Sequence, residues 1–147
     1  LYAALRVLDG VVLGTCRPRR DTKEFVRFLT QVEQTTAADQ AIHVILDNLS
    51  THKSPPVHRW LRRHPRVHFH FIPTSSSWLN LVERWFGEIT RDRIRRGTFD
   101  SVPALVAAIE DYLQHYNEAP RRFVWTKDAD MILDNIAKCP KPLSAAD

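Results

Sequence analysis

The stretch AIHVILDN, residues 41–48, decides the fold, because a continuous apolar run ends there in two polar residues. A short β-branched run of this kind is typical of a strand that is buried on both faces of a sheet. A helix pattern follows with Pro55–Pro56 at its start, where proline is favoured. VHFHFI (67–72) then forms another strand pattern. A strand, a helix and a strand in this order predict a sheet covered by helices.

Upstream of this unit the sequence predicts a β-hairpin and a helix. The apolar runs LYAALRVL and VVLGTC are joined by Asp9–Gly10, a strong short-range hairpin signal. From Asp21 the apolar residues recur every three to four positions, which indicates a helix. Thr22 is the expected N-cap of that helix.

Downstream, three further helices are expected. The first runs over Trp78–Ile94 and the second over Val102–Tyr116, with Asp100 or Ser101 as its cap. A shorter helix is expected from about Lys127 to Ala137, before a flexible tail at 141–147. The element order β-β-α-β-α-β-α-α-α predicts an α/β domain over residues 1–140, with a mixed sheet flanked by helices.

Composition limits the function classes. The chain has 147 residues, 44% hydrophobic and 26% charged, which suits one ordinary globular domain. It has neither a signal-peptide pattern nor an apolar run of membrane-spanning length, so we expect no membrane association. The two cysteines, Cys16 and Cys139, lie far apart and are interpreted as reduced thiols of a cytosolic protein.

The charge balance is basic, with 21 Lys and Arg against 17 Asp and Glu and a net charge of +4. This excess is compatible with a polyanion partner but does not establish one. His68 and His70 alternate on a strand pattern and therefore share one face. Because neither a cysteine nor a further histidine pair lies nearby in the sequence, a zinc site there is disfavoured.

Asp47 and Glu83 are the candidate catalytic carboxylates. Asp47 lies at the carboxyl end of the most apolar strand, the edge where sites of α/β sheets collect. The alternative is a turn initiator, a common role of Asp-Asn after a strand. Glu83 falls on the shoulder of its helix between core and solvent. Its alternative is a solvated glutamate on the flank of the helix.

Two such acids suit metal-dependent phosphodiester chemistry. Divalent ions activate the attacking oxygen and stabilise the leaving one, and Mg²⁺ takes few carboxylates together with water and phosphate oxygens. A third acid is missing from this chain, because Asp9 lies at the wrong end of its strands. The sequence therefore predicts a Mg²⁺ (or Mn²⁺) site that is two-thirds complete.

Polar and basic residues surround these acids in the sequence. Asn48 and His52 follow Asp47 in the sequence. They are candidate supporting residues, because amide and imidazole groups can orient water or phosphate. Four cations are candidate contacts to the DNA backbone; they are Lys53, Arg84, Arg91 and Arg95. A solvated loop and a solvated helix face explain the same residues equally well.

Two strings resemble a known family: LDNLSTHKSPPVHRWL and FHFIPTSSSWLNLVERWFGEIT. They are similar to the insertion sequence 630 family of bacterial transposases, of the mariner-type group in the DDE superfamily of endonucleases. The hairpin, the EFVRFL helix and YNEAPRRFVWTKDADMIL resemble the same family, so almost the whole chain is covered. The most specific part is WLNLVERWF following LDN.

The resemblance implies a fold and a site. Asp47 and Glu83 match the second and third catalytic acids of the family, and Asn80 matches the asparagine of the motif. The implied fold is RNase H-like, a five-stranded mixed sheet flanked by helices. The family's first catalytic aspartate lies on a strand upstream of the hairpin, so the chain resembles a catalytic domain that is truncated at its N-terminus and lacks its first strand.

The resemblance also implies an activity and partners. The parent protein is expected to cleave DNA strands with Mg²⁺ or Mn²⁺ and to transfer them in cut-and-paste transposition. Its partners would be double-stranded DNA, at transposon ends and target, and a second copy in a homodimer. The parent protein would be located in the bacterial cytoplasm and associated with the nucleoid. Two alternatives stay open: a catalytically dead DNA-binding or oligomerisation remnant, and an RNase H-like nuclease outside transposition.

Overall fold

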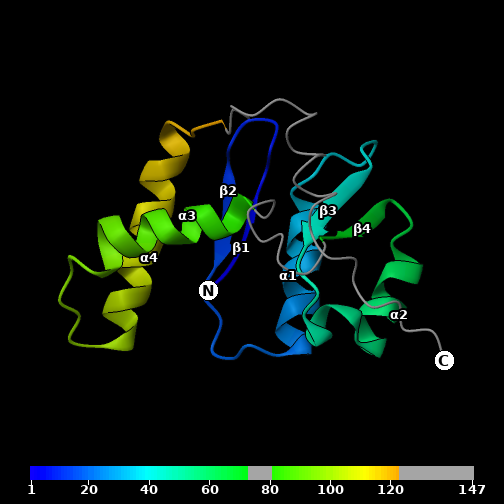
Figure 1. Cartoon of the computed structure of the whole chain (residues 1–147), viewed down its shortest axis with the longest axis horizontal. Coiled ribbons are helices and arrows are strands. Elements are labelled where there is room, and N and C mark those ends of the chain that lie inside the picture. Colours follow the sequence, from blue (N-terminus) through cyan, green and yellow to red (C-terminus); the bar gives the residue numbers. More distant parts are fainter. Residues whose placement is uncertain (73–80, 123–147) are drawn as a thin grey trace, which may run out of the picture.

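The strands form two small sheets in the computed structural model, which describes residues 1–72 and 81–122 (Figure 1). Strands β1 (Tyr2–Leu5) and β2 (Val12–Thr15) pair antiparallel. Strands β3 (Ile42–Leu46) and β4 (Val67–Phe71) pair parallel. Both expected pairings are present, but the single mixed sheet is divided into two.

The hairpin between β1 and β2 turns at Gly10, as the sequence predicts. Gly10 has φ +81°, a left-handed conformation that glycine adopts without steric cost. Arg6 and Asp9 form a bidentate ion pair across the turn. A Cβ atom at Gly10 would lie 2.3 Å from the carbonyl oxygen of Arg121, so the turn packs directly against the backbone that follows the last described helix.

Helix α1 spans Thr22–Gln34, and its N-cap lies one residue before the expected one. The N-cap is Asp21, not Thr22, because Asp21 is extended and its Oδ1 accepts from the backbone N–H of Glu24 at 2.9 Å. A carboxylate here also faces the positive end of the helix dipole.

The parallel pair is connected by two helical segments, η1 (Ser50–Lys53) and α2 (Pro55–Arg63). Helices α1 and α2 cover one face of β3 and β4, and their shared core is formed by Phe25, Leu29, Leu46, Val57, Trp60 and Val67. The expectation that the 41–46 strand is buried on both faces is wrong. Ile45 is 51% exposed and His43 is exposed, because both helices lie on the same side of this sheet.

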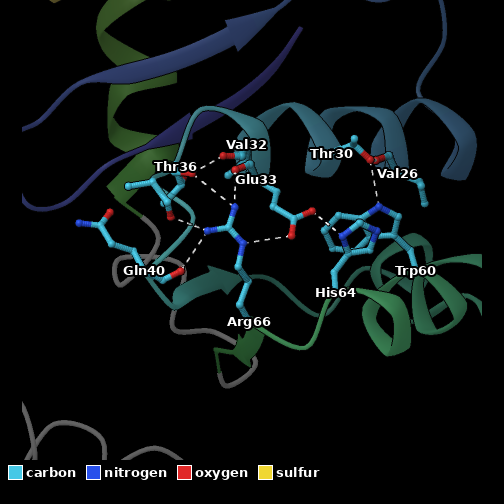
Figure 2. Close-up of polar contacts among 10 residues, drawn as sticks. Val26, Thr30, Val32, Glu33, Thr36, Gln40, Trp60, His64 and Arg66 are labelled. Carbon is cyan, nitrogen blue, oxygen red and sulfur yellow. Dashed lines mark hydrogen bonds and ion pairs between the residues drawn. The ribbon is translucent and has the colours of Figure 1, made fainter.

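The C-terminus of α1 is closed by a side chain from the start of β4 (Figure 2). Arg66 donates to the carbonyl oxygens of Glu33 at 2.7 Å and Ala37 at 2.6 Å, and its Nε lies 3.1 Å from the Glu33 carboxylate. The last carbonyls of a helix have no partner within the helix. One guanidinium therefore caps α1 and ties it to the parallel sheet.

A second core lies on the hairpin. Helix α3 (Leu81–Ile89) continues into a π-helical turn, η3 (Thr90–Ile94), and α4 (Val102–Glu118) follows with Ser101 as its N-cap. Their apolar faces meet β2 in a cluster formed by Val12, Trp85, Ile89, Ile109 and Leu113. The α4 side chain of Asn117 donates to and accepts from the backbone of Val12, at 2.8 and 2.9 Å, on the edge of β2 that faces away from β1.

A cavity of about 910 Å³ separates the two sheets. The cavity is lined on one side by residues 1–8, which include β1, and on the other by residues 41–47, which include β3. Because consecutive residues of each strand line it, the backbone edges of both strands border the cavity. In the described part of the chain, β1 pairs only with β2 and β3 only with β4. The sheet is therefore interrupted between β1 and β3.

Several expectations fall outside the described residues: the start of the 78–94 helix, the helix at 127–137, the tail and Cys139. Cys16 is a free thiol, and burial raises its pKa. Within the described ranges, none of the helices is both long and apolar enough to cross a membrane.

Candidate active site

Asp47 lies where β3 ends and lines the cavity between the sheets. Its side chain is 37% exposed. Oδ1 accepts from the backbone N–H of Leu49 at 3.3 Å. Oδ2 has no hydrogen-bond or ion-pair partner among the described residues. One oxygen is thus held by the chain while the other is available.

His52 fixes Asp47 from the following turn. Its Nδ1 lies 3.0 Å from Asp47 Oδ1 and 3.2 Å from the Asp47 carbonyl oxygen, so Nδ1 must carry the proton to donate to either. The imidazole packs on the ring of Phe25 in α1, with centroids 4.5 Å apart. The predicted supporting residue therefore contacts the carboxylate directly, and α1 sets its position.

Asn48 acts on the backbone rather than on the carboxylate. Its Nδ2 donates to the carbonyl oxygen of Ile72 at 2.6 Å, which joins the ends of β3 and β4. This bond and the one from Ile72 N–H to the Leu46 carbonyl, 3.0 Å, hold the sheet edge that carries Asp47. The sequence contained no sign of the Ile72 or Phe25 contacts, because both depend on how distant elements pack.

Glu83 lies in the first described turn of α3 and is exposed, while Trp85 and Ile89 point into the core. This agrees with the predicted position on the shoulder of the helix. Glu83 and Asp47 line the same cavity, together with Val82 and Phe86. Thirty-five residues, 48–82, separate the two candidate acids in the sequence. The tertiary structure brings both acids to one cavity. Asn80 lies outside the described residues.

The donor atoms at this cavity suit a hard divalent cation. Carboxylate oxygens are the ligands that Mg²⁺ takes from proteins, usually one or two with water completing the shell. Within residues 1–72 and 81–122, no group of three His, Cys, Asp or Glu side chains is arranged to hold a metal. The described chain therefore offers two acids of such a site, with Asp47 Oδ2 the clearest available ligand.

The cations predicted to contact DNA differ in their surroundings. Lys53 lies over the ring of Phe71, 4.8 Å from its centroid. Arg84 pairs with Glu88 at 3.5 Å and Arg91 with Asp92 at 2.8 Å; hydrogen bonding to Arg91 lowers the pKa of the Asp92 carboxyl. Arg95 is exposed. The ion pairs partly neutralise two of these cations.

The histidines of the parallel sheet gather on its exposed face. His68 and His70 lie on one face, as their alternation predicts, and His43 of β3 joins them. The closest ring nitrogens, His43 Nδ1 and His70 Nε2, are 2.9 Å apart. These rings lie on the face of β3 and β4 opposite to α1 and α2, and His43 also lines the cavity.

Three comparisons relate this chain to known proteins. A model of the DDE superfamily endonucleases matches residues 1–106, well over half of the chain. An uncharacterized 39 kDa protein of insertion element IS630 from Shigella sonnei is 25% identical over 120 residues, 82% of this chain and 35% of that protein. The chain therefore spans about a third of the length of that relative.

The structural likeness is to an integrase. The crystal structure of the catalytic core domain of BIV integrase aligns with a TM-score of 0.61 at 16% identity, over 92% of this chain and 86% of that one. The likeness confirms the predicted RNase H-like fold class. By the extent of the family match and the insertion-element relative, the chain belongs to the DDE superfamily endonucleases, as its resemblance to the insertion sequence 630 family predicts.

Proposed function

We propose that this chain is the catalytic part of a transposase that cleaves and transfers DNA strands, with Asp47 and Glu83 as metal-binding carboxylates. The observation that carries the proposal is that both acids line one cavity of an RNase H-like fold, in a chain that matches the DDE endonuclease family. Double-stranded DNA at the element ends and target would be the substrate, and Mg²⁺ or Mn²⁺ the cofactor.

The metal, when bound, would activate the attacking oxygen and stabilise the leaving one. Asp47 would offer Oδ2, because its Oδ1 is already engaged by Leu49 and His52. Glu83 would complete the pair from α3. His52 and Asn48 would act as positioning residues: His52 fixes the carboxylate, and Asn48 fixes the strand end beneath it. Asn80 remains a candidate supporting residue.

The third carboxylate would come from a strand that fills the gap between β1 and β3. Both strand edges border the cavity, and an unpaired sheet edge is a ready template for an added strand. Since this chain spans 35% of its insertion-element relative, a longer parent protein has room to supply one. Residues 1–140 would then form the rest of the catalytic domain, with 141–147 as its tail.

A catalytically dead remnant that binds DNA or oligomerises is the second candidate for this 147-residue chain. The favouring observation is that the described residues hold no group of three potential ligands. The two candidates differ in one outcome, since the remnant binds DNA but never cleaves it. Under the transposase proposal, the protein would act at the nucleoid in the bacterial cytoplasm and would form a homodimer.

The test uses the longer parent protein and DNA carrying its element ends. Asp47→Asn or Glu83→Gln should reduce Mg²⁺-dependent cleavage by at least about 1,000-fold, because each removes a charge that metal catalysis requires. DNA binding should stay within about twofold. Glu88→Gln, five residues along the same helix, serves as the matched control and should cleave normally.

Three results decide among the candidates. Cleavage at the normal rate in either carboxylate variant would remove Asp47 or Glu83 from the site. Absence of cleavage by the unmodified parent with both Mg²⁺ and Mn²⁺ would favour the dead remnant. Cleavage without joining of the freed 3′ end to target DNA would favour a nuclease outside transposition.

A further inference from the structure

All the charged side chains on the outer face of α2 are basic. On a helical wheel at 100° per residue, Val57, Trp60 and Leu61 point to the core, and the opposite arc carries the remaining side chains. Four exposed basic residues occupy that arc: His58, Arg59, Arg62 and Arg63. In Figure 1, α2 lies at the edge of the molecule, on the side away from α3 and α4.

Among the residues that the structure describes, no acidic side chain pairs with the arginines of this face. The sequence between Asp47 and Glu83, positions 48–82, contains no Asp or Glu at all. Within the described part of the chain, Arg59, Arg62 and Arg63 make no ion pair, unlike Arg84 and Arg91 on and after α3. An ordinary solvated helix face carries charges of both signs, so this face differs from one.

The arrangement costs free energy in the isolated helix. Arg59 lies three residues before Arg62 and four before Arg63, and like charges at these spacings destabilise a helix by about 0.2–0.5 kcal/mol per pair. The helix dipole favours cations in the last turn, which accounts for Arg62 and Arg63 but not for Arg59. An anionic partner would offset the repulsion among these three arginines.

The dimensions of the face suit a nucleic-acid backbone. A nine-residue helix is about 14 Å long, which equals the axial rise of about four base pairs. The exposed Lys53 precedes the helix in η1, five residues after Asn48. The positive surface therefore starts near the Asp47 end of β3 and continues outward along α2.

We propose that the outer face of α2, formed by Arg59, Arg62 and Arg63, binds the phosphate backbone of double-stranded DNA outside the cleavage site. The inference rests on the proposed function, and it moves the main backbone contact to α2 from Arg84, Arg91 and Arg95, which lie on α3 and after it and are called the α3 surface below. Binding through these side chains is independent of base sequence, because phosphates carry no sequence information. It holds the duplex beside the cavity that contains Asp47 and Glu83.

The test compares two triple variants of the 147-residue chain. Arg59→Gln/Arg62→Gln/Arg63→Gln alters the α2 face, and Arg84→Gln/Arg91→Gln/Arg95→Gln alters the α3 surface. Both remove three positive charges, so a pure effect of net charge weakens both equally. Binding of a fluorescent 20-base-pair duplex of arbitrary sequence is measured by anisotropy from 50 to 200 mM NaCl without divalent metal, so that cleavage plays no part.

The α2 variant should bind at least about tenfold more weakly at 50 mM NaCl. Its slope of log K against log salt should be smaller by about 3, since each phosphate contact contributes about 0.9. The α3 variant should lose less than about threefold. Both variants should melt within a few degrees of the unmodified chain, which excludes unfolding as the cause.

Equal weakening of the two variants, unchanged binding by the α2 variant, or no DNA binding by the unmodified chain would each overturn this proposal. None of these results bears on Asp47 and Glu83, whose test is metal-dependent cleavage by the parent protein. Loss of cleavage in the carboxylate variants together with unchanged binding by the α2 variant would retain the proposed function and reject the α2 surface.

Discussion

At the scale of single residues, Asp47 owes its position to its neighbours rather than to burial. Its side chain is more than a third exposed, and His52 and the Leu49 N–H both engage Oδ1. Groups that orient a metal ligand typically change metal affinity by 10- to 100-fold when removed. The His52 ring is itself held against Phe25, so the chain of contacts runs from α1 to the carboxylate.

Replacement of His52 should therefore weaken metal binding without unfolding the protein. We expect His52→Ala to lower the affinity for Mn²⁺ by about tenfold, as measured by isothermal titration calorimetry on the 147-residue chain. His52→Asn places an amide N–H near the position of Nδ1 and should recover most of that loss. His58→Ala, an exposed histidine on α2, is the control and should bind Mn²⁺ normally.

A purely structural role for His52 predicts another pattern. In that case both His52 variants would lower the melting temperature to the same extent, and the Mn²⁺ affinity of the folded fraction would not change. The recovery by asparagine is the readout that separates the two roles, because asparagine restores the hydrogen bond but not the contact with Phe25.

The sequence predicted the positions of the two candidate acids better than it predicted the contacts of the residues around them. Asp47 and Glu83 came from strand and helix positions together with a family resemblance, and they line one cavity. The contact of Asn48 with the Ile72 carbonyl depends on how the ends of β3 and β4 lie relative to one another, which no local pattern specifies. The ion pair of Arg84 with Glu88 was visible in principle, because residues four apart on a helix are neighbours.

At the scale of secondary-structure elements, one arginine connects α1 to the parallel sheet. Arg66 donates to the Glu33 carbonyl in the last turn of α1, to carbonyls of the segment that follows the helix, and to the Glu33 carboxylate (Figure 2). Lysine keeps the positive charge, but it lacks the planar guanidinium group whose several N–H donors form these bonds at the same time. Arg66 thus decides both where α1 ends and how it sits against β4.

Arg66→Lys should lower the free energy of unfolding by about 2 kcal/mol, the size expected for loss of hydrogen bonds from a charged group. Urea unfolding followed by circular dichroism measures the change. Arg62→Lys, a neighbouring arginine on the exposed face of α2, should change it by less than about 0.5 kcal/mol. A similar small effect at position 66 would mean that the bonds to α1 contribute little.

The sequence predicted the existence and order of the described elements, and the errors lie at their borders and surfaces. Thr22 and Asp21 are both good capping residues, and only the extended backbone of Asp21 selects it. The apolar run of β3 looked buried on both sides, yet Ile45 is half exposed. The hydrophobicity of a strand shows that its faces can be buried, but not which neighbouring elements bury each face.

At the scale of the whole molecule, the proposed function has an added strand enter the gap between β1 and β3. Arg6 N–H donates to Val11 and Ile42 N–H to the Arg66 carbonyl, so these residues face their paired strands. Because backbone groups alternate along a strand, the amides of Ala3, Leu5, His43 and Ile45 point the other way, toward the cavity. An added strand would bond to these four.

Hydrogen exchange tests this arrangement. In the 147-residue chain the amides of Ala3, Leu5, His43 and Ile45 should exchange fast, and in the longer parent protein they should be slowed by at least about 100-fold. The amides of Ala4 and Val44 face paired strands and should be protected in both. Equal exchange of the four cavity amides in chain and parent would show that no strand enters the gap.

The packing of the hairpin turn at Gly10 has a practical consequence. Exposed turns are normally the places where a protein tolerates an inserted tag or a permuted terminus. This turn has a left-handed glycine whose α-carbon faces the Arg121 backbone with no room for a methyl group. A label inserted there would push away the segment that leaves α4 and, through the bonds between Asn117 and Val12, would disturb β2. Reporter groups for this protein therefore belong at other surface positions.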